Sequence, residues 1–403
     1  MFGVNKWNEL WQSRQHIASQ LAQRGWSVVY STGQPTYSFP RGTLDWRAVP
    51  WVTTQREQDK VTVVTAGRLR SRYVRLPSWD RYALRQYVQD LRNATNGHGL
   101  SHRILYISHP MFWPYVEHLS DRMLIYHADD AFSLMPEWTT DMALMEEKLV
   151  ARADLVLASS EAMSRLLPGD GPQKARIFPN AVDAPAYLQA SNEPCPADLQ
   201  AIPHPRIGFT GSINLKVDLS LIARLANEKP DWHWVLVGAP ATKLASLRPD
   251  SCNYVEGLAA CKNLKNVHLL GPKPIWHVAL YMAHMDVNTL CYRHEPGRWW
   301  TAIYPLKLHE YLAVGQPVVA TDLETIQPFS SVLAIARSPQ EWLEAITMAL
   351  QSGGVGTRQE RQAVALANTW ECRIDQLVHW IEEVKEHNAL RSDRKKQASF
   401  LHP

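Results

Sequence analysis

The 403-residue sequence predicts an α/β protein composed of two doubly wound domains. Short apolar runs alternate with amphipathic stretches of roughly 10–15 residues, which is the pattern of parallel βαβ units. The alternation occurs twice, on either side of a proline-rich polar segment at 184–204 that we interpret as a linker. At about 150 residues per domain the length fits two large domains or three small ones, and the repeated pattern favours two.

The first alternation opens with a helix rather than a strand. Leu10, Ile17 and Leu21 share one face of a helix expected at 8–24, which Gly25 ends. Residues 1–4 are too short for a good first strand, so this strand is either very short or clipped by the assigned start. We expect residues 32–60 to be irregular. Further helices are expected at 79–93 and 141–152, and strands at 26–31, 103–108, 123–127, 154–159 and 175–178.

The second alternation follows the same plan. We expect strands at 206–210, 232–238, 266–270, 287–290 and 317–321, and helices at 217–227, 275–284, 306–314 and over most of the chain from 340. Ligands of doubly wound sheets bind at the carboxyl ends of the strands, so we expect the site there, in a cleft between the domains. The predicted domains are 1–190, joined by a C-terminal helix at about 371–390 that packs back on it, and 204–370, with a basic tail at 391–403.

The net charge of +3 is too small to indicate nucleic acid, but it is unevenly distributed. Residues 1–100 carry 14 basic and 6 acidic side chains, a local charge of +8, whereas residues 101–200 carry a local charge of −7. Five scattered cysteines without a C-x-x-C pair indicate free thiols in a reducing cytoplasm and no zinc site. No apolar run approaches about 18 residues and the N-terminus lacks a signal-peptide pattern, so we expect a cytoplasmic protein without a membrane span.

The segment at 304–320 has the most informative pattern. Pro305 suits the first position of a helix, Gly315 ends that helix, and a strand begins at Pro317. The N–H groups and the dipole of a helix N-terminus form a phosphate site, to which Lys307 adds a full positive charge. Glu310 lies on the same face and can accept hydrogen bonds from a pair of hydroxyls. Phosphate donors beside a hydroxyl acceptor describe a nucleotide-sugar site, although on spacing alone a surface helix with solvated charges fits equally well.

This segment, with its P-L-K-x-x-E-Y-L-A-x-G-x-P-V-V run, resembles glycosyltransferase family 4, retaining enzymes with a GT-B fold of two Rossmann-like domains facing each other across a cleft. Three further elements look like those of the family and follow in the expected order, at 154–160, 180–183 and 206–213. The similarity is greatest to the branch that makes bacterial surface polysaccharides, in which a W-x-x-x-W-x-x-R-Q element opens the chain. Here that element consists of Trp7, Trp11, Arg14 and Gln15.

The resemblance implies a role for each matching residue. Glu310 would bind the ribose hydroxyls, Lys307 and Lys216 the diphosphate, and Gly211 would let the backbone approach it. His127 looks like the active-site histidine that contacts the donor sugar, and with Lys307 and Glu310 it forms the predicted catalytic group. The other implied donor-binding residues are Ser212, Pro305 and Leu306, and the implied contacts to sugar or acceptor are Asp129, Asp130, Arg298 and Thr301. The family uses helix dipoles and cations instead of Mg²⁺, so no metal and no cofactor are expected.

Two positions depart from the pattern of the family. Ala302 stands where the family often has a second glutamate, so backbone amides around 299–301 are expected to hold the sugar. Ser212 stands where the family often has arginine, and Arg298 or Arg293 is expected to supply that cation.

Several residues also have a purely structural interpretation. Asp129 after a strand suits a helix cap, and Trp299 and Trp300 suit core packing better than stacking on a sugar. His109 and His309 are interpreted as structural or solvent-exposed.

Basic side chains cluster in two segments. The first is a strand-like stretch and the helix after it, and comprises Arg68, Arg70, Arg72, Arg75, Arg81 and Arg85. The second lies near the C-terminus and comprises Lys385, Arg391, Arg394, Lys395 and Lys396. Such clusters suit an anionic membrane surface, an acceptor with a diphosphate or uronic acid, or simply a solvated face.

The predicted function is that of a hexosyltransferase that transfers, with retention, from a UDP- or GDP-type sugar to a saccharide or lipid-linked saccharide acceptor in bacterial polysaccharide biosynthesis. Domain 1–190 would bind the acceptor and domain 204–370 the donor, with the protein peripheral on the inner face of the plasma membrane. Two alternatives remain open. A GT-B sugar-nucleotide epimerase would need acid/base carboxylates that the sequence does not place. A catalytically weak nucleotide-binding scaffold is favoured by Ala302 and Ser212.

Overall fold

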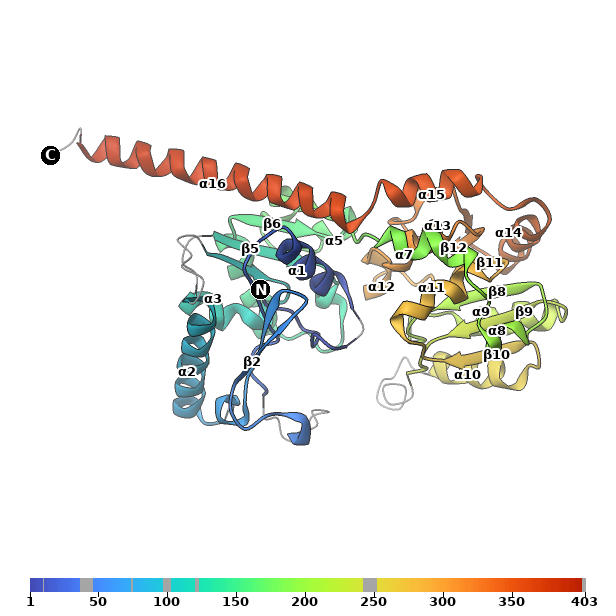
Figure 1. The fold of residues 1–403 in the computed structure, drawn as a ribbon, viewed down its shortest axis with the longest axis horizontal. Coiled ribbons are helices and arrows are strands. Elements are labelled where there is room, and N and C mark those ends of the chain that lie inside the picture. Colours follow the sequence, from blue (N-terminus) through green and yellow to red (C-terminus); the bar gives the residue numbers. More distant parts are fainter. Residues whose placement is uncertain are drawn as a thin grey trace. The chain divides into compact units, whose positions relative to one another are not determined.

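The computed structural model describes residues 1–9, 11–36, 46–73, 75–96, 103–119, 123–241 and 252–400, without the side chains of 96 and 391–400. The chain divides into two compact units (Figure 1). Unit 1 comprises Met1–Pro179 and Trp370–Pro403, and unit 2 comprises Asn180–Thr369. The division therefore lies before the predicted domain end at 190, because the residues from 180 onward pack on unit 2.

The sheet of unit 1 is built on either side of Phe2. Phe2 forms parallel bridges to Ser31 and Ile107. It thereby joins the strands in the order β2-β3-β1 to those in the order β4-β5-β6-β7, and the winding of the chain reverses here. The expected very short first strand is a single bridging residue. The strands are β1 (Val28–Ser31), β2 (Thr54–Gln58), β3 (Val61–Thr65), β4 (Ile104–Ile107), β5 (Met123–Ala128), β6 (Leu155–Ala158) and β7 (Ala175–Ile177).

The prediction of an irregular segment at 32–60 is wrong in its last part, where β2 pairs antiparallel with β3. The turn between them uses Asp59 and Lys60, whose φ angles are 52° and 64°. Positive φ at both central residues is what a tight two-residue hairpin requires. Strand β2 reads TQREQ and presents no apolar face, so no alternation marked it as a strand. Residues 37–45 lie outside the described residues.

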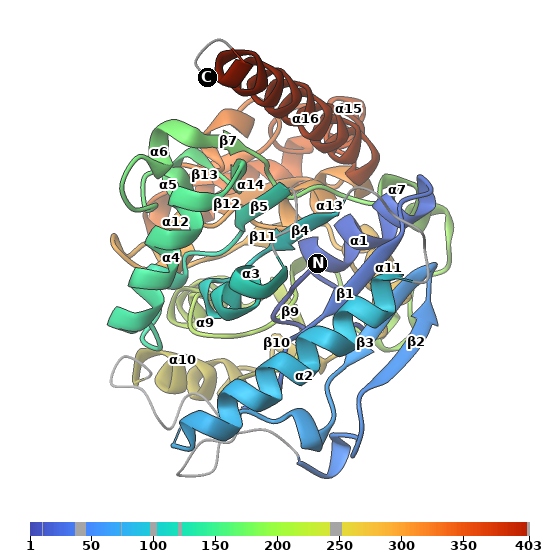
Figure 2. The ribbon, with the colours of Figure 1, turned by 90° about the vertical axis from the view of Figure 1, so that its left-hand side faces the viewer.

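Helices α1 (Ser13–Gln23) and α2 (Pro77–Asn96) pack on β1 and β3, and α2 crosses these strands in Figure 2. Helix α1 begins later than predicted, because Gln12 and Gln15 form a capping box at its start. Leu10, which the prediction placed on its apolar face, lies outside the described residues.

The long helix α16 (Trp370–Phe400) lies against α1. Arg24 forms an ion pair with Asp375 at 2.8 Å. His16 stacks on Trp370 with 5.1 Å between the ring centroids. The remaining helices of unit 1 are α3 (Trp113–Leu119), α4 (Thr140–Arg152), α5 (Glu161–Ser164) and α6 (Gly171–Lys174), with 3₁₀ turns at Trp46–Ala48, Arg68–Arg70, Pro110–Phe112 and Phe132–Leu134.

Unit 2 contains a parallel six-stranded sheet in the order β10-β9-β8-β11-β12-β13. The winding reverses between β8 and β11, which makes the carboxyl ends of these two strands the expected ligand position. The strands are β8 (Arg206–Thr210), β9 (His233–Val237), β10 (Val267–Gly271), β11 (Val287–Leu290), β12 (Val318–Thr321) and β13 (Ala334–Ala336). The main helices are α9 (Leu219–Glu228), α10 (Cys252–Asn263), α11 (Ile275–Ala283), α12 (Trp299–Ala302), α13 (Lys307–Val314), α14 (Pro339–Ser352) and α15 (Arg358–Leu366).

The prediction of a linker at 184–204 is wrong. This segment forms α7 (Ala184–Gln189), a 3₁₀ turn at Ala190–Asn192 and α8 (Ala197–Gln200), all within unit 2. Ala184, Ala190 and Leu199 are buried, so small apolar side chains hold the segment on the core. Prolines and polar residues between them conceal that pattern in the sequence.

Both units consist of helices packed on mainly parallel sheets that wind outward from a central strand. This doubly wound, Rossmann-like arrangement confirms the predicted fold class.

The buried carboxylate of Glu146 in unit 1 has a tyrosine as its partner, and no cation pairs with it among the described residues. Tyr126 on β5 donates a hydrogen bond of 2.5 Å to Glu146 on α4, and both side chains are buried. Burial raises the pKa of Glu146, and the bond from Tyr126 opposes this in part. Because the folded protein favours the protonated acid, stability falls as pH rises from the ordinary glutamate pKa through the raised one.

We therefore expect Glu146→Gln to raise the melting temperature at pH 7 and to match the wild type near pH 4. The amide oxygen of glutamine still accepts the bond from Tyr126, and no charge is buried. The matched control is Glu147→Gln on the exposed face of α4, which should change neither value. Thermal unfolding at the two pH values checks this, and a Glu146→Gln protein less stable than the wild type at pH 7 would contradict it.

Candidate functional site

The charged residues of unit 2 gather where its winding reverses. Strand β8 ends at Thr210 and is followed by Gly211, whose φ is 129°. A Cβ at Gly211 would lie 1.9 Å from Cε and 2.3 Å from Nζ of Lys307, so the lysine side chain lies directly against the glycine backbone. Any other residue at 211 would displace Lys307 and strain the backbone.

Helix α13 presents Lys307 and Glu310 from its first turn. Leu306 is its N-cap and Gly315, with φ of 81°, ends it, so the helix predicted at 306–314 is confirmed to within one residue. Burial lowers the pKa of Lys307 and raises that of Glu310, and in each case the opposite charge of the other residue opposes the shift. Two partly desolvated opposite charges on one helix turn are typical of a binding or catalytic site.

Tyr187 completes this group, although no motif in the sequence marks it. It lies on α7, in the segment expected to be a linker, and donates a hydrogen bond to Glu310. This bond fixes the orientation of the carboxylate. One feature of the sequence could have pointed to Tyr187. Tyr187 and Leu188 are two adjacent large hydrophobic residues in an otherwise polar segment, and both pack against the core of unit 2.

Lys216 lies beside aromatic rings of the same unit. Its Nζ is 5.1 Å from the ring centroid of Tyr292, which follows β11, and 5.8 Å from that of Trp299. These cation–π contacts place a second positive charge near the reversal of the winding.

The two arginines expected to replace the missing cation are both paired with Glu295. Arg293 forms an ion pair with one carboxylate oxygen, and Arg298 lies 3.2 Å from the other. Both guanidinium groups also stack on Trp300, which is buried as the packing interpretation expected. The single carboxylate of Glu295 offsets only one of the two guanidinium charges, so the three side chains together retain a net positive charge.

The other residues expected to contact the donor differ in their exposure. Ser212 is exposed and Pro305 is buried. Thr301 donates its hydroxyl to the carbonyl of Arg298 at 2.8 Å, within the turn that begins α12. Ala302 is buried, and its methyl side chain provides no carboxylate at this position.

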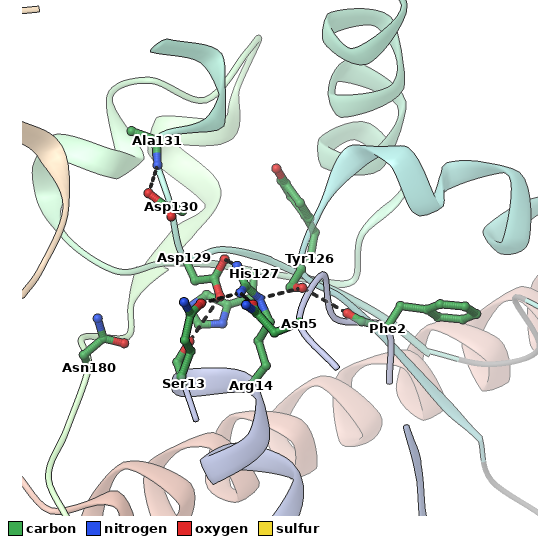
Figure 3. Close-up of polar contacts among 12 residues, drawn as sticks. Phe2, Asn5, Ser13, Arg14, Tyr126, His127, Asp129, Asp130, Ala131 and Asn180 are labelled. Carbon is green, nitrogen blue, oxygen red and sulfur yellow. Dashed lines mark hydrogen bonds and ion pairs between the residues drawn. The ribbon is translucent and has the colours of Figure 1, made fainter. Parts of the chain in front are cut away.

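In unit 1 the polar residues gather at the carboxyl end of β5, beside the reversal at Phe2 (Figure 3). Arg14 and Asp129 form a buried ion pair of 2.7 Å. Ser13 donates to the other oxygen of Asp129 at 3.1 Å. Arg14 also donates to Ser108 at 3.0 Å and to Asn5 at 2.7 Å. Nearly every polar atom of the pair is therefore bound within the protein, which indicates a role in positioning this loop.

This pairing explains the element that opens the chain. Trp7 and Trp11 contact each other edge to face at 5.3 Å, and the side chain of Gln15 accepts from the backbone of Gln12 at 3.1 Å. The two tryptophans and the glutamine thus shape the start of α1, from which Arg14 reaches Asp129.

His127 on β5 is enclosed, with 1% of its surface exposed. Its Nδ1 lies 2.6 Å from the hydroxyl of Tyr106, and its ring contacts Phe178 edge to face. Burial lowers its pKa to about 4, so the imidazole is neutral at pH 7. It is therefore a hydrogen-bonding group rather than an acid, and at present it reaches no solvent.

Asp130 is only half-buried and points away from the Arg14–Asp129 pair in Figure 3. It accepts a hydrogen bond of 3.0 Å from the backbone of Ala131. His109 accepts from the backbone of Met111 at 3.0 Å, in agreement with the structural interpretation of this histidine.

Metal ligands, cysteines and membrane-spanning helices were searched for along the described part of the chain. The described residues contain no group of three or more histidine, cysteine, aspartate or glutamate side chains arranged to hold a metal ion. All five cysteines are free thiols. Over the described ranges we find no helix that is both long and apolar enough to span a membrane.

The comparisons with known proteins support the fold. Residues 204–352 match the family model described as "Glycosyl transferases group 1". A sucrose-phosphate synthase from Thermosynechococcus elongatus superposes with a TM-score of 0.67 at 16% identity, covering 93% of both chains. The Anabaena protein Alr3699/HepE, solved with UDP and glucose, gives a TM-score of 0.63 at 17% identity over 91% of this chain and 94% of that one. The chain has the GT-B fold.

The curated relative that matches in sequence is a putative teichuronic acid biosynthesis glycosyltransferase, TuaH, of Bacillus subtilis. The two are 28% identical over 243 residues, which is 58% of this chain and 58% of the relative. The match thus spans little more than half the length of that protein. The group around Lys307 lies in unit 2, which contains the region matched by the family model. The group around Arg14 lies in unit 1.

We expect Arg14→Met to lower the free energy of unfolding by about 3–5 kcal/mol, since it leaves a buried carboxylate uncompensated. The double variant Arg14→Met/Asp129→Leu should recover most of that loss, because neither buried charge remains. Chemical denaturation measures both values. A cost below about 1 kcal/mol for the single variant would contradict the positioning role of the pair.

Proposed function

We propose that the chain is a retaining glycosyltransferase that moves a hexose from a nucleoside diphosphate sugar to a saccharide acceptor of a bacterial surface polysaccharide. The observation that carries the proposal is the Lys307–Glu310 pair beside Gly211, at the reversal of winding inside the region that matches the glycosyl transferase model. The name of the Bacillus relative supports the polysaccharide product, and the UDP and glucose of the Anabaena structure support the type of donor.

In this proposal the nucleotide is held mainly by α13 and α7. Glu310 accepts hydrogen bonds from the two ribose hydroxyls, and Tyr187 keeps its carboxylate in the orientation that this requires. Lys307 and the N-terminal turn of α13 face the diphosphate. Burial disfavours the charged form of Lys307. An arriving diphosphate would stabilise that form, because its negative charge lies beside the ammonium group.

The chemistry of the transfer is electrostatic. As the glycosidic C–O bond breaks, negative charge grows on the oxygen of the β-phosphate, where Lys307 and Lys216 stabilise it. The same oxygen takes the proton of the acceptor hydroxyl as the new C–O bond forms on the same face of the sugar. No protein general base is then needed, and the anomeric configuration is retained.

Unit 1 contributes neutral and acidic groups to the acceptor. His127, neutral above about pH 4, acts as a hydrogen-bonding partner of the sugar after a small shift of the surrounding rings. Asp130 is the more accessible carboxylate of this edge, so we assign the acceptor hydroxyl to Asp130 and the shape of the loop to Asp129.

A second candidate is a nucleotide-binding scaffold of low activity. It is favoured by the pairing of both Arg293 and Arg298 with Glu295, which leaves the diphosphate fewer cations. The two candidates differ in turnover and agree in nucleotide binding.

We expect Lys307→Ala to reduce the release of nucleotide from the donor about 10²–10³-fold, because a positive charge aimed at the leaving group is lost. Glu310→Gln should instead mainly raise the KM for the donor, since it weakens a contact made equally in ground and transition state. The measurement is the initial rate of nucleotide release from UDP- and GDP-sugars with a saccharide acceptor.

The matched control is Lys265→Ala, which removes an exposed lysine from the same unit and should leave both parameters unchanged. A folded Lys307→Ala protein with wild-type rates would refute this assignment. Nucleotide binding without any release from all donors tested would favour the scaffold.

A further inference from the structure

The segment that leads into α13, residues 303–306, has no side-chain cap. Leu306 is the N-cap residue, and its side chain makes no capping hydrogen bond. The backbone N–H of Leu308 bonds to the carbonyl of Pro305 at 3.2 Å. Within the described ranges the N–H groups of Leu306 and Lys307 donate to no acceptor, so both are open to a ligand.

Two side chains from outside α13 hold this segment by its carbonyl groups. Asn180 donates its amide to the carbonyl of Tyr304 at 2.6 Å. Thr325, which follows β12, donates its hydroxyl to the carbonyl of Ile303 at 3.0 Å. Asn180 and Thr325 are 8% and 6% exposed, so both contacts are shielded from water. The backbone that leads into α13 is therefore fixed by these donors instead of by a cap.

Pro305 makes the conformation of Tyr304 depend on such a donor. Proline has no N–H, and its ring disfavours the helical conformation for the residue before it. Tyr304 accordingly lies outside both α12 and α13. A buried carbonyl is costly to leave without a donor, so the amide of Asn180 favours the one direction of this carbonyl that meets it.

The backbone that presents this amide is itself anchored. Asn180 is the first residue of unit 2. Two residues further on, Val182 forms a parallel bridge with Thr369, and its N–H bonds to the carbonyl of Asn368 at 3.1 Å. Asn180 can therefore direct the carbonyl of Tyr304 rather than follow it.

The later turns of α13 are held in another way, by the fully buried side chains of Leu308, Tyr311 and Leu312. Glu310 lies among these anchored turns. Loss of the Asn180 amide should therefore change the segment at 303–306 and leave Glu310 in place.

We propose that Asn180 is a positioning residue that directs the open N–H groups of Leu306 and Lys307 toward the diphosphate of a nucleoside diphosphate sugar. It acts through the carbonyl of Tyr304 and does not touch the ligand. Donors that are already oriented bind an anion more tightly than donors that must first be ordered. The inference deepens the proposed function and rests on it, since that function places the diphosphate at the start of α13.

The test compares the affinity for UDP or GDP, whichever the wild type binds, with the affinity for the corresponding nucleoside. We expect Asn180→Leu, which keeps the size of the side chain but removes the donor, to bind the nucleoside diphosphate about tenfold more weakly. Its affinity for the nucleoside should equal that of the wild type, because Glu310 stays in place. Asn180→Ala, which cannot overpack the site, should show the same difference. NMR titration measures both affinities.

The matched control is Asn266→Leu. Asn266 is also 8% exposed, and its amide donates to the buried carbonyls of Ala226 and Trp232, each at 2.9 Å. Its replacement should lower the melting temperature and leave both affinities unchanged. If Asn180 served stability alone, Asn180→Leu would behave in the same way, and that result would overturn the inference.

An equal loss of affinity for the nucleoside diphosphate and the nucleoside in the Asn180 variants would also overturn it. These outcomes differ from a failure of the proposed function. A wild type that binds neither UDP nor GDP would refute that function and the inference with it, whereas variants that match a nucleotide-binding wild type would refute the inference alone.

Discussion

The group of Lys307, Glu310 and Tyr187 depends on one close approach, in which the side chain of Lys307 lies where a Cβ of residue 211 would stand. Only glycine allows it, and glycine also tolerates the φ of 129° found there. Because β8 ends beside Gly211 and α13 begins at Lys307, the contact joins the end of a strand to the start of a helix. Glu310 then follows from the helix repeat, and Tyr187 orients it from α7.

The two units place charged residues at equivalent edges of their sheets but satisfy them differently. In unit 1, Arg14 and Asp129 form an ion pair and hydrogen-bond to neighbouring side chains. Their charges therefore compensate each other and stabilise the loop after β5. In unit 2, burial disfavours the charged forms of Lys307 and Glu310, and Tyr187 is the neighbour that hydrogen-bonds to Glu310. A ligand with a diphosphate and vicinal hydroxyls would relieve both costs. This difference supports a positioning role for Arg14 and Asp129 and the proposed binding role for Lys307 and Glu310.

Elements with a strong apolar period could be predicted to within a residue or two, as β8 and α13 illustrate. Strand β2 was not predicted because it has no apolar face. Helix α7 was not predicted because a short helix that packs through alanine shows little hydrophobic periodicity. Lys307 and Glu310 were predictable because helix spacing brings them onto one face, whereas Gly211 was predictable only because the segment at 206–213 resembles the family. The Tyr187–Glu310 and Arg14–Asp129 contacts could not be predicted, because they form only when segments distant in the sequence pack together. The prediction that Arg293 or Arg298 supplies a cation overlooked Glu295, which lies between them in the sequence and pairs with both.

The most direct test of the central claim is calorimetric titration of UDP and GDP into the wild type, Gly211→Ala and Gly271→Ala. Both glycines have positive φ, but a Cβ at 271 meets no atom within 4 Å, whereas one at 211 meets Lys307. We expect the wild type and Gly271→Ala to bind one of the nucleotides with equal affinity. Gly211→Ala should bind it at least about tenfold more weakly, a loss of about 1.4 kcal/mol. Equal affinity of Gly211→Ala and the wild type would contradict the placement of the diphosphate at this contact.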